Sequence, residues 1–289
     1  MGKKSQLAKN IVITGNRGFI GKNLLQYFLS KGYVVNGIDL KDGNDLRSLD
    51  SLRRLIRSYR PDYVFHLAAI TQVGEGLKLP KHCIENNILS TVNICEVAKE
   101  FGFKLIHMST DKVYGEGLDK KEGHILSAKY PYDVSKLCCE NIVNSYKETF
   151  GIKCVIARSC NVYGMNDDNI NRIIPTVLAG IDDDLEIKIR SNGKLKRDYI
   201  YIDDLLNGLE LIMDENGVYN ISSGENLSVL DILDIVKSIL PEKIKYVILN
   251  HSDKEIINQS LDFNKIRRLG FTPKHTMAKF LGEYLCKYQ

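Results

Sequence analysis

The sequence lacks the features that cross-link a protein or hold it in a membrane. Its 289 residues include no tryptophan, only six prolines, and seven cysteines without a C-x-x-C pair. An odd number of cysteines among apolar neighbours argues against a disulfide framework and against a zinc site. No stretch approaches the ~18 apolar residues of a membrane span, and "IVITG" is too short for the apolar part of a signal peptide. We therefore expect a cytoplasmic protein with no metal and no membrane attachment.

A strong excess of one charge is also missing. The chain has 40 Lys and Arg against 36 Asp and Glu, a net charge of +4. The basic residues are scattered among acids rather than gathered in runs, which argues against nucleic-acid binding. The length allows one large domain or a domain with a smaller partner, and a hydrophobic content of 44% is ordinary for a globular enzyme.

The first half alternates short apolar runs with longer amphipathic stretches. The runs are rich in Val and Ile and are bounded by turn residues; they span 10–14, 33–39, 62–68, 103–109 and 153–158. Segments of helical length lie between most of them, at 19–32, 48–60, 86–102 and 132–151. This order predicts an α/β fold with a Rossmann-type, doubly wound parallel sheet.

The pattern changes after about residue 165. A helix-then-strand pair within 202–222 is expected to return to the sheet, and the remainder suggests a smaller, interleaved α/β domain. We expect residues 1–165 with about 200–222 to form the cofactor-binding domain. Residues about 166–199 with 223–289 would form the substrate-binding domain. The stretch "LDKKEGH" (118–124) is predicted to be a solvated loop.

A glycine-rich turn follows the first predicted strand. The stretch "TGNRGFIG" places Gly15, Gly18 and Gly21 three residues apart at the start of the first helix. Glycines there allow a tight turn, close approach of a diphosphate to the backbone, and close packing of helix on strand. The helix N-terminus favours the anion. This context, more than the triplet itself, predicts a dinucleotide site.

Asp39 stands at the end of the second strand. A carboxylate there can accept hydrogen bonds from both ribose hydroxyls of NAD and would repel the extra phosphate of NADP. Arg17 and Lys41 are cations near it in sequence, so NADP remains the minority alternative.

Tyr132 and Lys136 are four residues apart in "YPYDVSK", hence neighbours on one helix face. A phenol is a poor base at neutral pH unless a nearby ammonium stabilises its phenolate, and Lys136 is placed to do so. The hydroxyl of Thr110 is a candidate third member, bonding the same substrate oxygen. His66 and His107 are interpreted as satisfied strand histidines.

These residues together resemble the extended short-chain dehydrogenase/reductase family, the NAD-dependent epimerases and dehydratases of nucleotide sugars. The resemblance covers about residues 8–289. Its motifs occur in the family's order: T-G-x-x-G-x-x-G, Asp39, "DLRS" (45–48), "FHLAA" (65–69), Asn86, "ST" (109–110), Y-x-x-x-K, "RSCNVYG" (158–164) and "RDYIYIDD" (197–204).

The resemblance implies roles for individual residues and a homodimer formed through helices around 86–101 and 132–150. The implied NAD-binding residues are Gly15, Arg17, Gly18, Phe19, Ile20, Gly21, Asp39, Asp45, Leu46, Leu67, Ala68, Ala69, Asn86, Tyr132 and Lys136. The implied contacts to the nucleotide-activated hexose are Asn161, Arg172 and Arg197. The implied catalytic residues are Thr110, Asp111, Lys112, Tyr132 and Lys136.

Asp111 and Lys112 narrow the choice within the family. Oxidation at sugar C4 is common to its members, whereas a 4,6-dehydratase also needs a base for the C5 proton and an acid for the C6 hydroxyl. Lys112 as base and Asp111 as acid meet that need, although an ammonium must first be driven to its neutral form, by burial beside other cations. The Asp-Lys pair is similar to that of CDP-glucose 4,6-dehydratases and of the membrane-free UDP-N-acetylglucosamine dehydratases, whereas the dTDP-glucose enzymes carry Glu in place of Lys112.

The sequence thus favours an NAD-dependent nucleotide-sugar 4,6-dehydratase. Two alternatives stay open: a nucleotide-sugar 4-epimerase of the UDP-glucose or UDP-GlcNAc type, in which Asp111 and Lys112 are merely structural, and an idle NAD-sensing protein on the same fold. For the two residues themselves, the structural alternative is an exposed turn pair. An intact Thr110, Tyr132 and Lys136 argues against the idle protein.

Overall fold

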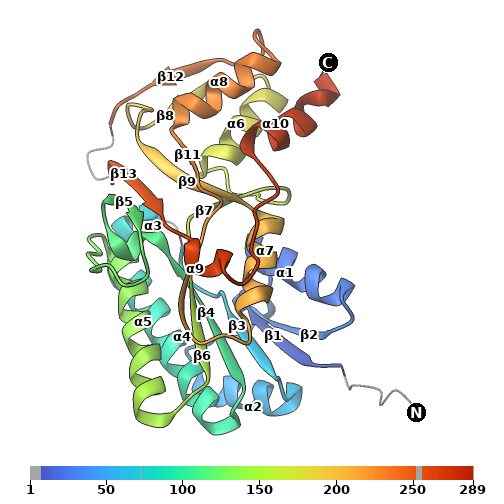
Figure 1. The fold of residues 1–289 in the computed structure, drawn as a ribbon, viewed down its shortest axis with the longest axis vertical. Coiled ribbons are helices and arrows are strands. Elements are labelled where there is room, and N and C mark those ends of the chain that lie inside the picture. Colours follow the sequence, from blue (N-terminus) through green and yellow to red (C-terminus); the bar gives the residue numbers. More distant parts are fainter. Residues whose placement is uncertain (1–7, 72, 252–255, 289) are drawn as a thin grey trace. The chain divides into compact units, whose positions relative to one another are not determined.

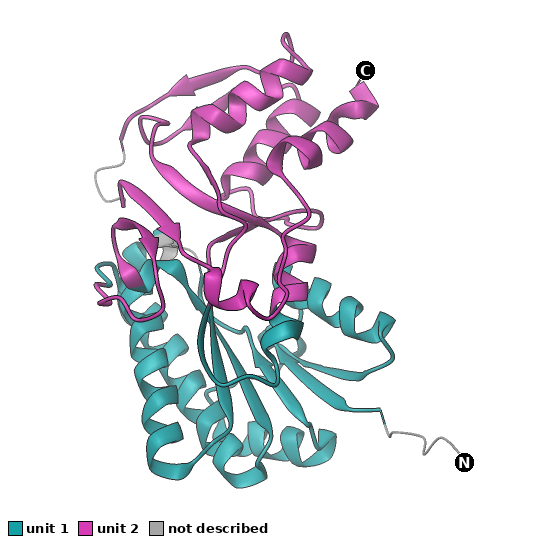
Figure 2. Ribbon diagram, in the orientation of Figure 1, with its two compact units in different colours: residues 1–113, 128–158, 209–219 teal, residues 114–127, 159–208, 220–289 magenta. Residues whose placement is uncertain are grey.

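A computed structural model describes residues 8–71, 73–251 and 256–288 (Figure 1). The chain divides into two compact units (Figure 2). Unit 1 comprises residues 1–113, 128–158 and 209–219, and unit 2 comprises residues 114–127, 159–208 and 220–289. The described helices include none with the length and apolar character needed to cross a membrane.

Unit 1 is built on a six-stranded sheet with the order β10-β6-β4-β3-β1-β2. The strands are β1 (Asn10–Thr14), β2 (Val34–Ile38), β3 (Tyr63–His66), β4 (Lys104–Thr110), β6 (Cys154–Ser159) and β10 (Gly217–Ile221). Its helices are α1 (Phe19–Ser30), α2 (Leu49–Tyr59), α3 (Val73–Lys78), α4 (Pro80–Phe101), α5 (Pro131–Phe150) and the end of α7 (Ile202–Ile212). β1 pairs in parallel with β2 and β3, and β3 in parallel with β4. The predicted α/β fold and the return of the chain to this sheet at β10 are confirmed.

Helices cover both faces of this sheet. Val12 and Val64 pack into a core with α2, α4 and α5 on one face. The alternate residues point the other way, where the rings of Phe65 and Phe28 of α1 lie 5.1 Å apart. This alternation follows from the pleat of a strand, and full burial on both faces accounts for the continuous apolar runs.

The long helix α5 has clear start and stop signals. Pro131 occupies its first turn, where a missing N–H costs nothing. Gly151 follows its last turn with φ 69°, a left-handed conformation that suits glycine. Tyr132 and Lys136 therefore lie in the first two turns of α5.

Unit 2 has a five-stranded mixed sheet, in the order β11-β9-β13-β5 with β7 paired to β9, and a two-stranded sheet. Its strands are β5 (Gly117–Lys120), β7 (Asn161–Tyr163), β8 (Ile187–Ile189), β9 (Lys196–Tyr201), β11 (Glu225–Leu227), β12 (Tyr246–Ile248) and β13 (Asn258–Leu261). Its helices are α6 (Ile173–Asp182), α8 (Val229–Ile239), α9 (Asn264–Arg267), α10 (Met277–Leu285) and the start of α7. The apolar core of unit 2 includes Val177, Val236 and Leu281.

The units differ from the expected domain boundaries at residues 114–127, 159–165, 200–208 and 220–222, which belong to unit 2. For residues 114–127 the cause is β5, which pairs in parallel with β13. The prediction of a loop over 118–124 was therefore wrong for residues 118–120, which form a strand, although Leu118 and Asp119 are exposed as expected. The pairing joins segments about 140 residues apart, and no local pattern announces it.

Candidate active site

The glycine-rich turn of unit 1 leaves no room for side chains at two of its three glycines. Gly15 has φ 73°, and a Cβ added there would lie 2.9 Å from the backbone of Ala68. A Cβ on Gly21 would lie 2.1 Å from the carbonyl oxygen of Gly15. Gly18 is the N-cap of α1 and offers no side chain to cap the helix. Phe19 and Ile20 open the helix, so this turn fits a dinucleotide diphosphate held by backbone N–H groups.

Asp39 ties the end of β2 to this turn. Its carboxylate accepts hydrogen bonds from the backbone N–H of Arg17 and of Lys41, each at 2.9 Å. The guanidinium of Arg17 pairs with Asp42 at 2.8 Å. Asp39 places a negative charge at this point, and the positive charge of Arg17 is already paired with Asp42. This arrangement fits the ribose of NAD better than the extra phosphate of NADP.

Asp45, Leu46 and Leu67, three of the implied NAD-binding residues, lie in segments that hydrogen bonds hold in place. Asp45 bonds Arg47 at 2.7 Å, which lowers the pKa of the Asp45 carboxyl. The Leu46 carbonyl accepts from Asn93 at 2.8 Å. After β3, the N–H of Leu67 donates to the Thr14 carbonyl at 3.2 Å.

Ala68 and Ala69 begin a segment that Asn87 fixes in place. Its Nδ2 donates to the Ile70 carbonyl at 3.1 Å and to Ser135 Oγ at 2.9 Å, while its Oδ1 accepts from the Ile70 N–H at 2.8 Å. Asn86, the residue predicted from sequence, is only half-buried and donates to Asn87 Oδ1 at 3.4 Å. The buried Asn87 therefore links the segment after β3 to α5.

Thr110, Asp111 and Lys112 lie together where β4 ends. The Thr110 hydroxyl donates to Asp111 Oδ1 at 3.0 Å, and Lys112 Nζ lies 3.3 Å from the same oxygen. Asp111 is fully buried and the Lys112 side chain is 19% exposed. An exposed turn pair, the structural alternative for these two residues, is excluded by this burial.

Tyr132 and Lys136 are both buried on α5. Lys136 Nζ donates to the carbonyl of Met108 in β4 at 2.5 Å, so the helix is fastened to the strand that ends in Thr110. Burial lowers the pKa of Lys136. In its ammonium form, a buried lysine favours the ionised form of a neighbouring phenol.

Two histidines are buried in the neighbouring strands. His66 Nδ1 lies 2.8 Å from Thr14 Oγ1, and Nε2 lies 3.3 Å from Thr91 Oγ1, as expected for a satisfied histidine. The prediction was wrong for His107, because neither of its ring nitrogens has a hydrogen-bond partner among the described residues. Burial and the Lys136 charge lower the pKa of both, that of His66 to about 3.

A buried ion pair that the sequence did not reveal links α5 to β6. Glu140 of α5 binds Arg158 of β6 through two oxygens, with contacts of 2.6 and 3.0 Å, and accepts from Ser109 Oγ at 2.5 Å. Glu140 is four residues after Lys136, on the same helix face. That spacing was the available signal, but it could not reveal the partner on another strand.

The three predicted sugar-nucleotide residues belong to unit 2. Asn161 of β7 donates to the Asp198 carbonyl at 3.2 Å. Arg172, before α6, pairs with the buried Asp167 at 3.0 Å. Arg197 of β9 donates to the carbonyls of Lys196 and Ile257 at 2.9 and 3.1 Å. All three carry fixed internal contacts.

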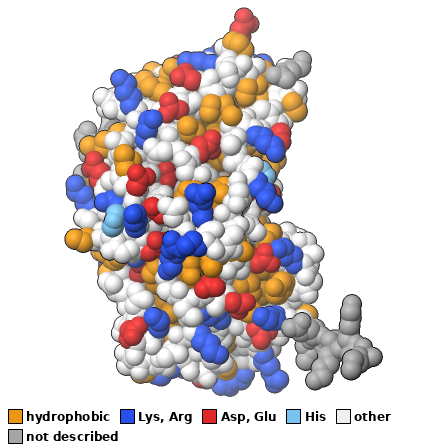
Figure 3. All heavy atoms as spheres, in the orientation of Figure 1, with side chains coloured by type: hydrophobic (Ala, Val, Ile, Leu, Met, Phe, Trp, Pro, Cys, Tyr) orange, Lys and Arg blue, Asp and Glu red, His pale blue; other side chains and the backbone are white. Residues whose placement is uncertain are grey.

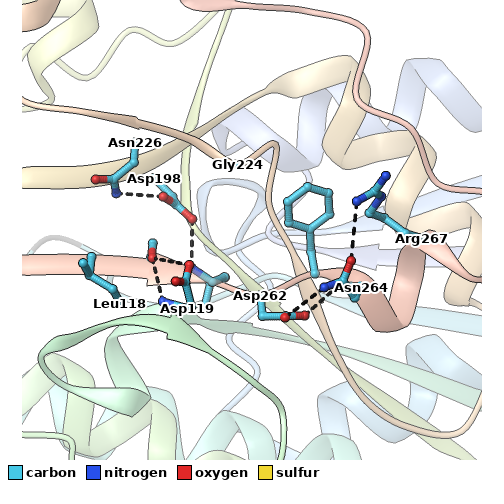
Figure 4. A pocket seen from close by; sticks show the side chains of 11 residues that line it. Leu118, Asp119, Asp198, Gly224, Asn226, Asp262, Asn264 and Arg267 are labelled. Atoms are coloured by element: carbon cyan, nitrogen blue, oxygen red, sulfur yellow. Dashed lines mark hydrogen bonds between the residues drawn. The ribbon is translucent and has the colours of Figure 1, made fainter.

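Unit 2 also contains a cavity of about 370 Å³ (Figure 4). Its polar groups bond one another: Asn226 donates to Asp198 at 2.8 Å, and Asn264 donates to Asp262 at 2.9 Å. None of the predicted site residues lines it.

The surface in Figure 3 mixes basic, acidic and apolar side chains.

Comparison with known proteins identifies the family. Residues 11–222 match the model of the NAD dependent epimerase/dehydratase family. The chain belongs to this family. Membership confirms the resemblance seen in the sequence, the Rossmann-type fold and NAD as the cofactor.

Individual relatives carry both of the activities considered above. The chain is 32% identical to a dTDP-D-glucose 4,6-dehydratase of Dictyostelium discoideum over 270 residues, 80% of this chain and 62% of that protein. It is 26% identical to a dTDP-glucose 4,6-dehydratase of Haemophilus influenzae, covering 95% and 96%. A UDP-glucose 4-epimerase of Thermotoga maritima, solved with UDP-glucose, superposes with a TM-score of 0.90 at 26% identity, covering 96% and 99%. The likeness of the Asp-Lys pair to CDP-glucose enzymes stays a prediction.

Proposed function

We propose that this protein is an NAD-dependent nucleotide-sugar 4,6-dehydratase. It would convert a nucleoside-diphosphate hexose to the 4-keto-6-deoxyhexose with loss of water. The observation that carries the proposal is the buried Thr110-Asp111-Lys112 group at the end of β4, next to the helix that bears Tyr132 and Lys136. Oxidation at C4 needs only the tyrosine and its lysine, whereas elimination needs a further acid and base.

The residues divide the proton transfers among them. Tyr132, supported by the Lys136 charge, takes the proton of the C4 hydroxyl. Lys112 takes the C5 proton, which a C4 ketone makes acidic, and Asp111 gives a proton to the C6 oxygen as it leaves as water. Lys112 then returns a proton to C5. NAD, when bound, accepts a hydride from C4 and returns it to C6.

The proton count closes through Thr110. Over one cycle Tyr132 gains a proton and Asp111 loses one, so a proton must pass between them before the next turnover. The Thr110 hydroxyl donates to Asp111 at 3.0 Å, and we infer that it carries this proton to Asp111. Water in the site would exchange these protons with solvent. The burial of Asp111 and Tyr132 limits the access of water.

The nucleotide-sugar 4-epimerase is the second candidate, because the structural match to the Thermotoga epimerase extends over 96% of this chain. An epimerase re-reduces the same ketone and requires neither Asp111 nor Lys112. The buried contact between those two residues supports the dehydratase.

A panel of nucleotide-activated hexoses, including dTDP-, CDP- and UDP-glucose, tests the choice. Products are weighed and examined by NMR after incubation with the NAD-loaded protein. Loss of one water with a new C6 methyl group supports the dehydratase. Unchanged mass with inverted C4 supports the epimerase, and turnover of no hexose rejects both.

The proposal also includes the oligomeric state and the cellular compartment. We infer a cytoplasmic homodimer that pairs through α4 and α5, whose exposed faces include Leu89 and Phe150, 42% and 50% exposed. Sedimentation should give twice the 32.8 kDa monomer mass. A charged substitution at Leu89 should yield monomers, and a monomeric wild-type protein would reject the pairing.

A further inference from the structure

Gly37 is a glycine inside a strand, and none of the roles described above requires it. It belongs to β2, where it pairs with Ile13 of β1. Its φ is not positive, so the backbone conformation there would accept any residue. Glycine weakens the interior of a strand and often marks the close approach of another group. The glycine at this position therefore points to a neighbour that needs the room.

That neighbour is Asn16 of the glycine-rich turn. A Cβ added to Gly37 would lie 2.6 Å from Asn16 Oδ1, and the Cγ and Nδ2 atoms of the same amide are nearer still. On the side of α1, a Cβ added to Gly21 would lie 2.7 Å from Asn16 Cα. Asn16 is thus enclosed between a helix and a strand, each of which has a glycine where it meets this residue.

The residues on either side of Asn16 bond the end of β2. The N–H of Gly15 donates to the carbonyl of Ile38 at 2.8 Å. The N–H of Arg17 donates to the carboxylate of Asp39 at 2.9 Å. Three consecutive residues of the turn therefore meet the last part of β2, and Asn16 is the one that meets it through its side chain.

Asn16 and the carboxylate of Asp39 share one face of this strand end. Asp39 continues the extended backbone of β2, with φ −143° and ψ 147°. Successive residues of an extended chain point to opposite sides, so Gly37 and Asp39 face the same side. The Asn16 amide therefore fills the position beside the carboxylate, and its size limits how closely the turn can approach Asp39.

The polar end of the Asn16 side chain does not serve the stability of the protein. Its Oδ1 is buried and accepts no hydrogen bond from any residue that the structure describes. A buried amide oxygen without a donor is costly. Residues that cost stability are typical of functional sites, which fits the place of Asn16 in the turn that binds the cofactor diphosphate.

We propose that Asn16 is a positioning residue of the NAD site: its amide, packed on Gly37, sets the separation of the glycine-rich turn from Asp39 and so the preference for NAD over NADP. It acts through the bond between Arg17 and Asp39 and makes no contact with the reacting atoms. This inference goes beyond the proposed function, because it concerns the cofactor and holds for dehydration and epimerisation alike.

A double-mutant cycle tests the packing of the two residues. Wild type, Gly37→Ala, Asn16→Ala and the double variant, all full-length and dialysed free of nucleotide, are titrated with NAD in a calorimeter. Gly37→Ala should raise the dissociation constant about tenfold, because the added methyl group displaces the turn. Asn16→Ala alone should raise it about threefold, since the backbone bonds of the turn remain.

The double variant gives the decisive value. Its methyl group at position 37 enters the space that the amide leaves, so it should bind NAD as Asn16→Ala does rather than with the product of about thirtyfold. Gly123→Ala is the control, because no atom lies within 4 Å of the added Cβ, and it should bind as wild type does. A multiplicative effect in the double variant overturns the proposal.

The ratio of the NADP and NAD dissociation constants separates positioning from a merely structural role. In Asn16→Ala the ratio should fall about threefold, because Asp39 is held less firmly where the extra phosphate would lie. Urea denaturation of the nucleotide-free variant should show no loss of stability, since the unpartnered oxygen is gone. An unchanged ratio, with or without a loss of stability, overturns the proposal.

Two further outcomes are also decisive. If Gly37→Ala does not fold, the double variant replaces it: a folded double variant supports the packing, and an unfolded one contradicts it. A wild-type protein that binds neither dinucleotide overturns the proposal. Lack of turnover on every hexose would reject the proposed reaction and leave these binding measurements valid, so the two failures are distinguishable.

Discussion

Glu140 on α5 and Arg158 on β6 form a fully buried, two-oxygen ion pair with contacts as short as 2.6 Å. Both side chains are at most 4% exposed, so removal of one charge leaves the other unpaired away from water. We expect Glu140→Gln to lower the free energy of unfolding by about 3–5 kcal/mol.

Urea denaturation measures this loss. The control is Arg53→Met, which breaks the more exposed pair with Glu100 and should cost far less. A loss in Glu140→Gln as small as that of the control would show that α5 and β6 do not depend on the buried pair.

Replacement of Lys112 by Met should stop water loss and spare oxidation at C4. The amine is needed only for the C5 proton, whereas Tyr132 and Lys136 remain in place. Absorbance of reduced nicotinamide should therefore accumulate after substrate is added. Lys147→Met, at a more exposed lysine of α5, should behave as wild type. Dehydration by Lys112→Met at the wild-type rate would remove Lys112 from the mechanism.

Gly15→Ala should abolish NAD binding, because it combines a φ of 73° with a Cβ 2.9 Å from the backbone of Ala68. Calorimetric titration with NAD measures the loss, and circular dichroism checks that the variant is folded. Gly282→Ala is the matched control: no atom lies within 4 Å of the added Cβ, and the site is inside α10. It should keep NAD affinity and gain up to about 1 kcal/mol of stability.

Asp39→Asn should weaken NAD binding by about tenfold or more and reduce the preference for NAD over NADP, since a charged hydrogen bond contributes about 1.5–3 kcal/mol. The ratio of the two dissociation constants is the measurement. Asp42→Asn releases Arg17 but leaves Asp39, so it should reduce the preference for NAD less than Asp39→Asn does. An unchanged ratio in Asp39→Asn would place the source of selectivity elsewhere.

Acid should destabilise the fold through His66. Burial and the Lys136 charge lower its pKa from 6.5 to about 3, so the folded state holds the neutral ring. The stability this provides is present above about pH 6.5 and is lost as the pH falls toward 3. At about pH 5 the loss should be about 2 kcal/mol.

The same unfolding experiment at about pH 7.5 and about pH 5 tests this dependence on His66→Gln. The variant has no imidazole to protonate at this position, so its stability should fall less than that of wild type over the same interval. Equal losses in both proteins would assign the acid sensitivity to other groups.

The sequence predicted the parts of the molecule that depend on local pattern. The glycine spacing, the i,i+4 pair of Tyr132 and Lys136 and the apolar strands each obey a short-range rule, and the structure contains the corresponding turn, helix face and sheet. The pairing of β5 with β13 has no such rule, because the two strands are distant in sequence.

Side-chain partners were harder to predict than element positions. The family pattern pointed to Asn86, but burial and three hydrogen bonds make its neighbour Asn87 the residue that fixes the segment after β3. His66 finds two threonines and His107 none, although the two residues occupy comparable strands. Such differences arise from which side chain the adjacent strand or helix presents, and a linear pattern does not contain that information.

The short 3-10 turn over Asp111–Tyr114 follows the strand that maintains the fold and begins with the proposed acid and base. Upstream of it, β4 is completely buried and fastened to α5 through Met108, so substitutions there threaten the whole fold. Asp111 and Lys112 stand just beyond the strand, and no described backbone hydrogen bond of the sheet depends on their side chains. Under the proposed function, substitutions at these two adjacent positions would therefore change the reaction and leave β4 and the glycine-rich turn intact.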